Sequence, residues 1–290
     1  MHKEIMKELT QKLIKLALEE DLSPNGDISL NFLENSAVHK KAQIIAKEDG
    51  VMACSWIAEA VFDEYKKNFS SHCERSEAIS QIKVKDGEEF KKGDILLELE
   101  APANFLLSCE RTILNFLQRL CAIATATRKL SSIIKNYPCK LLDTRKTMPG
   151  MRALEKEAFK TGGGENHRFN LSDAVMLKEN HLAVIASAAW QSSPPVKTIV
   201  EINKDNLNQL EKWIELGVDQ IMLDNFSPKE VEEIIKTLLP FTRHPLPKIE
   251  VSGNITKENI IDYAKTGCNY ISTSACMTRV HNLDLSMKIN

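Results

Sequence analysis

The feature that most constrains the fold is a regular alternation of apolar and helical segments in the C-terminal half. Six apolar segments have the length of strands, and we predict strands at 139–143, 174–178, 197–202, 219–223, 248–251 and 269–272. The helices between them carry boundary signals, such as Ser227-Pro228-Lys229-Glu230, a capping box with proline at the first helical position. Strands that alternate with helices form a parallel sheet. Such a sheet can close as a barrel, and the chain has room for six or seven strands, fewer than the usual eight.

The N-terminal part has a different pattern. An apolar stripe predicts a helix over residues 2–20, and alternating segments with Gly-containing turns predict strands between residues 38 and 99. Residues 103–135 are expected to form a long apolar helix that leads from a first α+β domain into the second domain. Residues 66–80 are polar and lack a clear period, so we interpret them as a surface loop or small insertion.

The composition limits the class of protein. The net charge of -2 lacks the basic excess that nucleic-acid binding usually needs. No apolar run approaches the ~18 residues of a membrane span, and the N-terminal helix has acids throughout, unlike a signal peptide. The seven cysteines include no CxxC pair, so neither zinc ligation nor a disulfide framework is expected. We therefore expect a cytoplasmic protein with no nucleic-acid or membrane partner.

Polar and small residues follow the predicted strands at the points where the strands end. In α/β barrels the chemistry gathers at this C-terminal rim. The rim residues are Thr144, Arg145, Lys146, Lys178, Glu201, Asp224, Ser252, Gly253, Asn254, Thr273, Ser274 and Ala275, and a loop between the first two strands adds His167 and Arg168. The cations suit carboxylates and phosphates, and the small residues suit a phosphate bound by backbone N–H groups. The sequence therefore predicts a pocket for a small molecule that carries several negative charges.

The two acids at the rim, Glu201 and Asp224, have several open roles. They could hold a divalent cation, bind sugar hydroxyls or stabilise positive charge in a transition state. Structural alternatives exist as well: Lys178 and Glu201 could form a rim salt bridge, and His167 could be a hydrogen-bonding histidine of the scaffold. On the long helix, Arg111 could pair with a neighbouring acid or face solvent.

Several stretches of the chain resemble the quinolinate phosphoribosyltransferase family. They are ALEEDLSPNGDIS, CERTILNFLQRLCAIAT, DTRKTMPGMRALEKEAFKTGGGENHRFNLSDAVMLKENH, VDQIMLDNFSP, IEVSGNI and TGCNYIST. They occur in the family's order and run nearly end to end, which is far more specific than any short motif. The resemblance implies transfer of phosphoribosyl from phosphoribosyl pyrophosphate to quinolinate, a pyridine dicarboxylate. Decarboxylation then gives nicotinate mononucleotide, pyrophosphate and CO2, on the route to NAD.

The resemblance also implies a fold and a set of roles. The fold is an N-terminal α+β open sandwich plus an incomplete α/β barrel, which we place at residues 1–118 and 119–279, with residues 280–290 packing back on the first domain. The quinolinate carboxylates would be bound by Arg145, Lys146, His167, Arg168 and Lys178, with Arg111 contributed by the partner subunit of a homodimer. Glu201 and Asp224 would face the ribose and a magnesium ion held through the substrate, and residues 252–254 and 273–275 would hold phosphate. The expected catalytic residues are Lys146, Lys178, Glu201 and Asp224, and Thr144 is expected to contact substrate.

The chain departs from the family in several places, among them the expected phosphate turn and the C-terminal segment. The turn is Ser252-Gly253-Asn254 where the family usually has Ser-Gly-Gly. If its third position needs a positive φ, asparagine is the least costly replacement for glycine. The C-terminal TRVHN also differs from the family's usual THS. Activity is expected to survive both changes, because neither touches the cationic cluster.

Two rival functions are a sister transferase for a related aromatic acid and a non-catalytic sensor of a phosphorylated metabolite. The number of cations favours a substrate with two carboxylates over one with a single carboxylate. The two rim acids oppose the sensor, because acids in an anion pocket weaken binding unless magnesium or a cationic transition state is involved.

Overall fold

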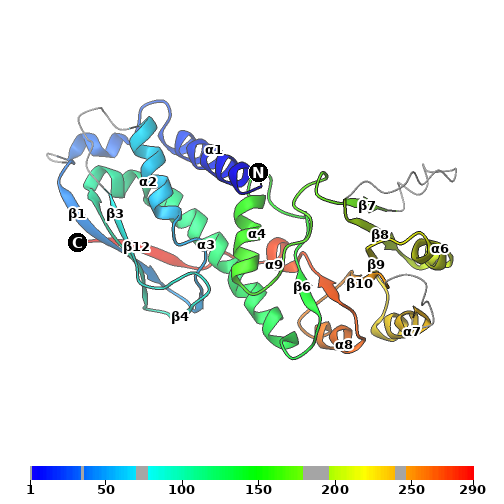
Figure 1. Cartoon of the computed structure of the whole chain (residues 1–290). Helices are drawn as coiled ribbons and strands as arrows, with labels where there is room; N and C mark the ends of the chain where they lie inside the picture. The colour runs from blue at the N-terminus through cyan, green and yellow to red at the C-terminus, as the bar shows by residue number, and fades with distance from the viewer. Residues whose placement is uncertain (1, 34–35, 70–77, 179–195, 239–245) are drawn as a thin grey trace. The chain divides into compact units, whose positions relative to one another are not determined.

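The computed structural model describes residues 2–33, 36–69, 78–178, 196–238 and 246–290 (Figure 1). The chain divides into two compact units. Unit 1 comprises Met1–Ala126, Thr147–Gly163 and Val280–Asn290, and unit 2 comprises Thr127–Lys146 and Gly164–Arg279. Both units are therefore assembled from separated stretches of sequence, while the domain boundaries at residues 118 and 279 stay a prediction.

Unit 2 is built on a parallel sheet of six strands in the order β6-β11-β10-β9-β8-β7. The strands are β6 (Lys140–Leu142), β7 (Val175–Leu177), β8 (Thr198–Ile202), β9 (Gln220–Asp224), β10 (Lys248–Ser252) and β11 (Tyr270–Ser272). Each lies within its predicted segment or extends one residue beyond it. The two strands of this sheet that come first in the sequence, β6 and β7, form its two edges. An isolated β-bridge joins Glu165 to Leu142 at the β6 edge. The prediction of an incomplete α/β barrel is confirmed.

The helices of unit 2 follow the strands. They are η2 (Lys204–Gln209), α6 (Leu210–Glu215), α7 (Pro228–Leu238), α8 (Ile260–Lys265) and α9 (Ala275–Thr278). The predicted capping box at the start of α7 is confirmed, because Glu230 Oε2 accepts from the Ser227 N–H at 2.7 Å and Ser227 Oγ accepts from the Glu230 N–H at 3.4 Å. Because each strand leads into its helix at the same edge of the sheet, all six C-terminal strand ends point to one rim.

The capping box gives a pH-dependent prediction. The hydrogen bond from Lys204, together with those from Ser227, lowers the pKa of Glu230 from its ordinary value of 4.5 to about 2. A carboxyl group with a lowered folded-state pKa stabilises the fold above its unfolded value, and this stabilisation is lost as the pH falls through the window from 4.5 to 2. We expect Glu230→Gln to lower the melting temperature at pH 7, with the difference from the parent shrinking below pH 4.5. Thermal unfolding followed by circular dichroism at several pH values measures the difference in melting temperature between the variant and the parent. A difference that does not change with pH would contradict the lowered pKa of Glu230.

Unit 1 contains an antiparallel sheet of four strands in the order β12-β1-β5-β3, together with a two-stranded sheet, β2-β4. Its elements are α1 (His2–Leu22), η1 (Ile28–Phe32), β1 (His39–Ala46), β2 (Gly50–Val51), α2 (Ile57–Asn68), β3 (Ile79–Ile82), β4 (Glu89–Phe90), β5 (Ile95–Pro102), α4 (Arg152–Thr161), β12 (Leu285–Ile289) and most of α3 (Ala103–Ile134). The C-terminal strand β12 pairs with β1 over Ala42–Ala46. An antiparallel sheet with helices fits the predicted α+β class.

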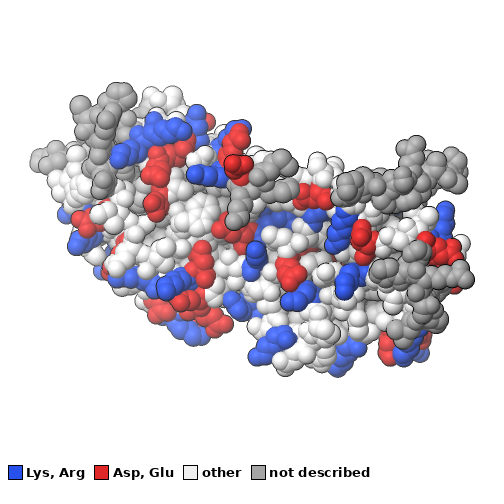
Figure 2. Space-filling model, viewed as in Figure 1, with Lys and Arg blue, Asp and Glu red and all other residues white. Residues whose placement is uncertain are grey.

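The segment expected to be a loop at 66–80 is partly regular. Helix α2 continues to Asn68 and β3 begins at Ile79, and residues 70–77 between them lie outside the described residues. Figure 2 shows Lys and Arg side chains interspersed with Asp and Glu over the visible face. Across the described ranges, no helix has both the length and the apolar character that crossing a membrane would need.

Candidate active site

Two adjoining cavities lie at the C-terminal rim of the parallel sheet of unit 2. The arginine cavity, about 380 Å³, is lined by Asp143, Thr144, Arg145, Lys146, His167, Arg168, Met176, Lys178, Glu201, Met222, Asp224, Glu250, Ser252 and Ser272. The turn cavity, about 250 Å³, is lined by Thr144, Lys146, Asp224, Asn225, Ser252, Gly253, Asn254, Ile255, Ser272, Thr273, Ser274, Ala275 and Arg279. Five residues line both. Unit 2 thus brings together every predicted site residue except Arg111, which belongs to unit 1.

Two arginines face the arginine cavity without an acidic partner. Arg168 Nη1 donates to the carbonyl oxygen of Ala174 at 3.0 Å, and its Nη2 lies 3.4 Å from Met176 Sδ. Burial lowers the pKa of Arg168, and the neighbouring charge of Arg145 lowers it further. The Nε of Arg145 is buried and makes no hydrogen bond to any described residue. Within the described part of the chain neither guanidinium forms a salt bridge. The cavity therefore favours an anion such as a carboxylate, which can accept two parallel hydrogen bonds from one guanidinium.

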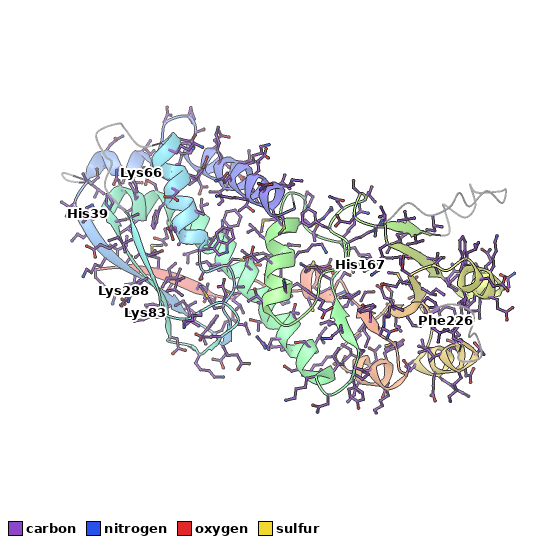
Figure 3. All side chains as sticks on the ribbon, in the orientation of Figure 1. His39, Lys66, Lys83, His167, Phe226 and Lys288 are labelled. Carbon is purple, nitrogen blue, oxygen red and sulfur yellow. The ribbon has the colours of Figure 1, made fainter. Side chains whose placement is uncertain are left out.

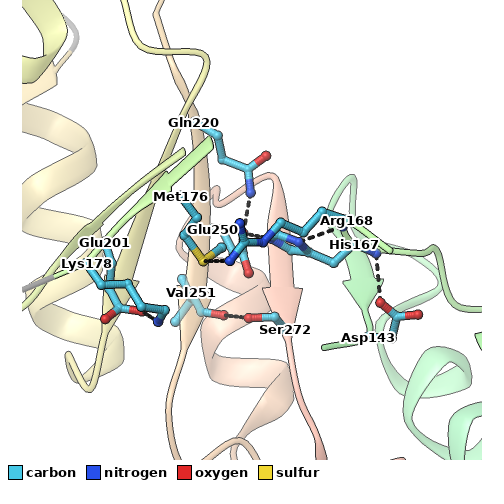
Figure 4. Close-up of polar contacts among 10 residues, drawn as sticks. All are labelled: Asp143, His167, Arg168, Met176, Lys178, Glu201, Gln220, Glu250, Val251 and Ser272. Atoms are coloured by element: carbon cyan, nitrogen blue, oxygen red, sulfur yellow. Dashed lines mark hydrogen bonds and ion pairs between the residues drawn. The ribbon is translucent and has the colours of Figure 1, made fainter. Parts of the chain in front are cut away.

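Lys178 and Glu201 form an ion pair on the wall of the arginine cavity (Figure 4). Lys178 directly follows β7, and Glu201 lies near the end of β8, the neighbouring strand. The Glu201 side chain is 18% exposed and that of Lys178 is 43% exposed. The salt bridge considered as an alternative is therefore present. It does not remove the pair from the site, because both side chains line the cavity.

His167 lies in unit 2 (Figure 3), and both of its ring nitrogens are engaged there (Figure 4). Its Nδ1 accepts from the backbone N–H of Arg168 at 2.7 Å, and its Nε2 lies 3.2 Å from Glu250 Oε2. Its own backbone N–H donates to Asp143 Oδ1 at 2.8 Å. This geometry favours the structural alternative for His167, while the contact with a substrate carboxylate stays a prediction. Glu250 was missed from the sequence, where the only signal was an acid in the middle of a predicted strand.

The turn cavity is shaped by a backbone that needs special residues. Gly253 has a φ of +97°, and a Cβ there would lie 2.8 Å from Asn225 Cγ and 2.9 Å from the Asn225 backbone nitrogen. Asn254 has a φ of 50°, so the third position of the turn does adopt the positive φ for which asparagine is the mildest replacement of glycine. Its carbonyl accepts from Asn259 Nδ2 at 2.9 Å.

Substitution at Asn254 separates backbone strain from side-chain contacts. We expect Asn254→Gly to keep the stability of the parent and Asn254→Ala to lose about 1 kcal/mol, because alanine resists the left-handed region. Urea unfolding followed by fluorescence measures both variants. Equal losses in the two variants would instead show that the hydrogen bond of 3.3 Å from Asn254 Nδ2 to Asn225 Oδ1 carries the stability.

Two further observations concern charge at the rim. Arg279, just after α9, lines the turn cavity and was missed, although it lies in the TRVHN segment that departs from the family. Asp224 Oδ2 accepts from Asn225 Nδ2 at 2.7 Å. Among the residues that the structure describes, no three His, Cys, Asp or Glu side chains gather into a metal site. A divalent cation at Glu201 and Asp224 would therefore need ligands from a substrate.

Two arginines eight residues apart on α3 have different environments in unit 1. Arg119 Nη2 lies 2.8 Å from Glu155 Oε1, and both side chains are largely buried. Arg111 is exposed and forms no hydrogen bond or ion pair with the described residues. The local salt bridge considered for Arg111 is absent, which leaves its guanidinium open to a ligand or another chain.

Two sequence profiles match the chain almost end to end. The quinolinate phosphoribosyl transferase N-terminal domain matches residues 27–121, and the corresponding C-terminal domain matches residues 123–288. The chain belongs to the quinolinate phosphoribosyltransferase family. The resemblance identified from the sequence is confirmed.

Similar proteins with curated names agree with this family. The chain is 37% identical over 287 residues to a probable nicotinate-nucleotide pyrophosphorylase (carboxylating) of Bacillus subtilis, covering 96% of this chain and 93% of that protein. It is 36% identical to a protein of the same name in Methanocaldococcus jannaschii, with 98% and 99% covered. A solved structure of the nicotinate-nucleotide pyrophosphorylase from Francisella tularensis has a TM-score of 0.84 and 31% identity, covering 98% of this chain and 96% of that one. Relatives of this family thus extend over both units of the chain.

Proposed function

We propose that this protein transfers phosphoribosyl from phosphoribosyl pyrophosphate to quinolinate with decarboxylation, and that it does so in the cytoplasm. The products are nicotinate mononucleotide, pyrophosphate and CO2, a step of NAD biosynthesis. The observation that carries the proposal is the pair of adjoining cavities, one with two arginines that have no salt bridge to the described residues and one with a glycine turn. Membership of the family supports this function.

The arginine cavity suits a pyridine dicarboxylate. Arg145 and Arg168 can each donate two parallel N–H hydrogen bonds to one carboxylate, which a lysine cannot do. Lys178 adds a third cation to the lining of this cavity. A monocarboxylate would leave one of the two guanidinium groups unpaired in a partly buried place, so two carboxylates fit better than one.

The turn cavity suits the phosphate end of the other substrate. Gly253 lets the backbone come close to a ligand, and Thr273 and Ser274 supply hydroxyl groups beside it. Lys146 and Asp224 line both cavities, so they lie where a sugar would connect the phosphate to the pyridine. Arg279 adds a cation at this end.

The proposed chemistry follows from the placement of charge. As pyrophosphate leaves the ribose, positive charge develops on the sugar, and Glu201 and Asp224 stabilise it electrostatically. Lys146 stabilises the departing phosphate oxygens. The ring nitrogen of quinolinate bonds to the sugar carbon and becomes a pyridinium. The pyridinium takes up the electron pair of the neighbouring carbon–carboxylate bond, CO2 leaves, and that ring carbon gains a proton. The protein contributes positioning and an electric field.

We propose that magnesium accompanies the pyrophosphate group. Glu201 and Asp224 are the acids that would hold it, with the remaining ligands from substrate oxygens, as is common for this ion. When bound, magnesium supplies positive charge against the pyrophosphate. A magnesium ion that takes most of its ligands from substrate oxygens fits this pocket, because no three His, Cys, Asp or Glu side chains of the described residues gather into a metal site.

We propose a homodimer in which Arg111 of one chain completes the arginine cavity of the other. Arg111 is exposed and has no partner among the residues that the structure describes, and the apolar side chain of Leu107, one turn earlier on α3, is 41% exposed. An exposed cation beside an exposed apolar side chain is what an interface with a polar rim requires. This arrangement would supply the site residue that unit 2 lacks.

The dimer gives a complementation prediction. Arg111→Ala and Lys146→Ala are each expected to be inactive, but a mixture refolded or co-expressed together should recover about a quarter of the parent activity. Half of random dimers are mixed, and each mixed dimer has one intact site of two. The assay is product formation at fixed total protein. No recovery, with mixed dimers verified by tagged purification, would place Arg111 outside the partner's site.

The test of the function is a two-product assay. Purified protein is mixed with quinolinate, phosphoribosyl pyrophosphate and magnesium while CO2 and nicotinate mononucleotide are followed together, with nicotinate as the control substrate. Matched formation of both products, lost in Glu201→Ala, is the expected result. Turnover of nicotinate alone would instead show a sister transferase.

A further inference from the structure

A buried acid lies beneath the arginine cavity, and the proposed chemistry does not use it. Glu250 is in the middle of β10, two residues before Ser252, so both side chains face the inside of the barrel. Its exposed fraction is 0%. Its neighbours on the cavity wall include the apolar side chains of Met176 and Met222. An acid in such surroundings is costly unless hydrogen bonds satisfy it.

Glu250 uses one oxygen for its hydrogen bonds. Gln220 Nε2 donates to Oε2, and His167 Nε2 lies 3.2 Å from the same oxygen (Figure 4). Oε1 makes no hydrogen bond to any residue that the structure describes. The contacts of this acid with the protein therefore run through Gln220 on the neighbouring strand β9 and through His167 in the loop before β7.

The tautomer of His167 follows from these contacts. A backbone amide can only donate, so the Arg168 N–H bond to Nδ1 at 2.7 Å requires that Nδ1 carry no hydrogen. The ring hydrogen is then on Nε2 and is donated to Glu250 Oε2. The imidazole is neutral and has no N–H left for a ligand carboxylate. Its part is to connect Glu250 to the backbone of Arg168.

We infer that Glu250 is a positioning residue, which holds His167 and thereby sets Arg168 for the substrate carboxylate. The contacts that hold the His167–Arg168 segment include Asp143 on the His167 backbone N–H, Glu250 on the ring, and the ring on the Arg168 N–H. The guanidinium group itself contacts the Ala174 carbonyl and the Met176 sulfur. Because no acid among the described residues forms a salt bridge with it, the backbone anchor has a large part in setting its place. The inference rests on the proposed function for the identity of the substrate.

Substitutions at Glu250 separate positioning from charge. In Glu250→Gln, the amide oxygen can replace Oε2 and accept both hydrogen bonds. The amide NH2 group then replaces Oε1, which has no partner among the described residues. Glu250→Leu removes the acceptor and frees the imidazole. Gln220→Leu is the control, because it removes one of the two hydrogen bonds to Oε2 but leaves the His167 contact intact. If only buried hydrogen bonds to Glu250 mattered, Gln220→Leu would show a substantial part of the loss seen in Glu250→Leu.

The kinetic test measures kcat and KM for each substrate. We expect Glu250→Leu to lower kcat/KM for quinolinate about 100-fold, chiefly through KM, since misplacing a binding group by about 1 Å has effects of this size. KM for phosphoribosyl pyrophosphate should change less than about threefold, because the turn cavity does not include His167 or Arg168. Glu250→Gln and Gln220→Leu should stay within about fivefold of the parent. An unchanged KM for quinolinate in Glu250→Leu, or equal losses in Glu250→Gln, would overturn the inference.

A second measurement does not depend on folding of the leucine variant or on turnover. Nitrogen-15 NMR of the histidine rings in the parent protein and in Glu250→Gln should show His167, identified by its loss in His167→Gln, as the neutral tautomer protonated on Nε2. A hydrogen on Nδ1 would overturn the inference. If the parent fails to convert quinolinate but shows this tautomer, the proposed function fails while the role of Glu250 in holding His167 stands.

Discussion

Replacement of Arg145 with methionine is expected to lower kcat/KM for quinolinate by about 10²–10³-fold. Arg145 lies at the C-terminal end of β6 with a buried Nε that has no partner among the described residues. A bound carboxylate would supply that partner. Loss of one member of a desolvated charge pair costs about 2–5 kcal/mol, and each 1.4 kcal/mol is about tenfold. Steady-state kinetics with quinolinate varied at saturating phosphoribosyl pyrophosphate measures the effect.

Two control variants make this result specific. Arg145→Lys keeps the positive charge but cannot donate two parallel hydrogen bonds to a carboxylate. Its kcat/KM for quinolinate should therefore lie between those of Arg145→Met and the parent. Lys140→Met removes a cation from the other end of the same strand, where Lys140 Nζ lies 3.4 Å from Glu165 Oε1. It should leave the kinetics within about threefold of the parent, since an exposed ion pair contributes little. If Lys140→Met were as damaging as Arg145→Met, overall charge rather than a bound carboxylate would explain the loss.

Replacement of Gly253 with alanine is expected to raise KM for phosphoribosyl pyrophosphate by about 10² or more. A Cβ at this position would collide with the side chain and backbone of Asn225, and the φ of +97° is itself unfavourable for alanine. The turn must therefore shift, and its N–H groups would no longer converge on a phosphate. Binding of phosphoribosyl pyrophosphate by calorimetry measures the effect independently of chemistry.

The control for Gly253→Ala is a glycine with the same strain but no collision. Gly267 has a φ of +88° and no atom within 4 Å of an added Cβ. Gly267→Ala should therefore lower stability without changing KM. Unaltered binding of phosphoribosyl pyrophosphate to a folded Gly253→Ala protein would remove the 252–254 turn from the phosphate site.

Much of the fold and rim could be predicted from the sequence because both depend on local patterns. The apolar segments at 197–202 and 248–251, for example, became β8 and β10, since length and helix boundary signals identify buried parallel strands. Parallel strands end at one edge, so residues such as Lys178 and Asp224 could be assigned to a common rim without any knowledge of contacts. The capping box at Ser227 is equally local. Comparison of the turn with its family pattern suggested asparagine as the least costly replacement if the third position needs a positive φ, and Asn254 does adopt one.

The sequence by itself therefore determined which residues lie at the strand ends, but the tertiary structure decided what each of them contacts. His167 and Glu250 are 83 residues apart, and Gln220 and Glu250 are 30 apart. Their hydrogen bonds exist only because the parallel sheet places distant strands and a loop around one interior. The same holds for Arg119, whose partner Glu155 is 36 residues away. Arg111 on the same helix has no such partner among the described residues. Periodicity specifies the face and the end of an element, while hydrogen-bond partners depend on how separate elements pack.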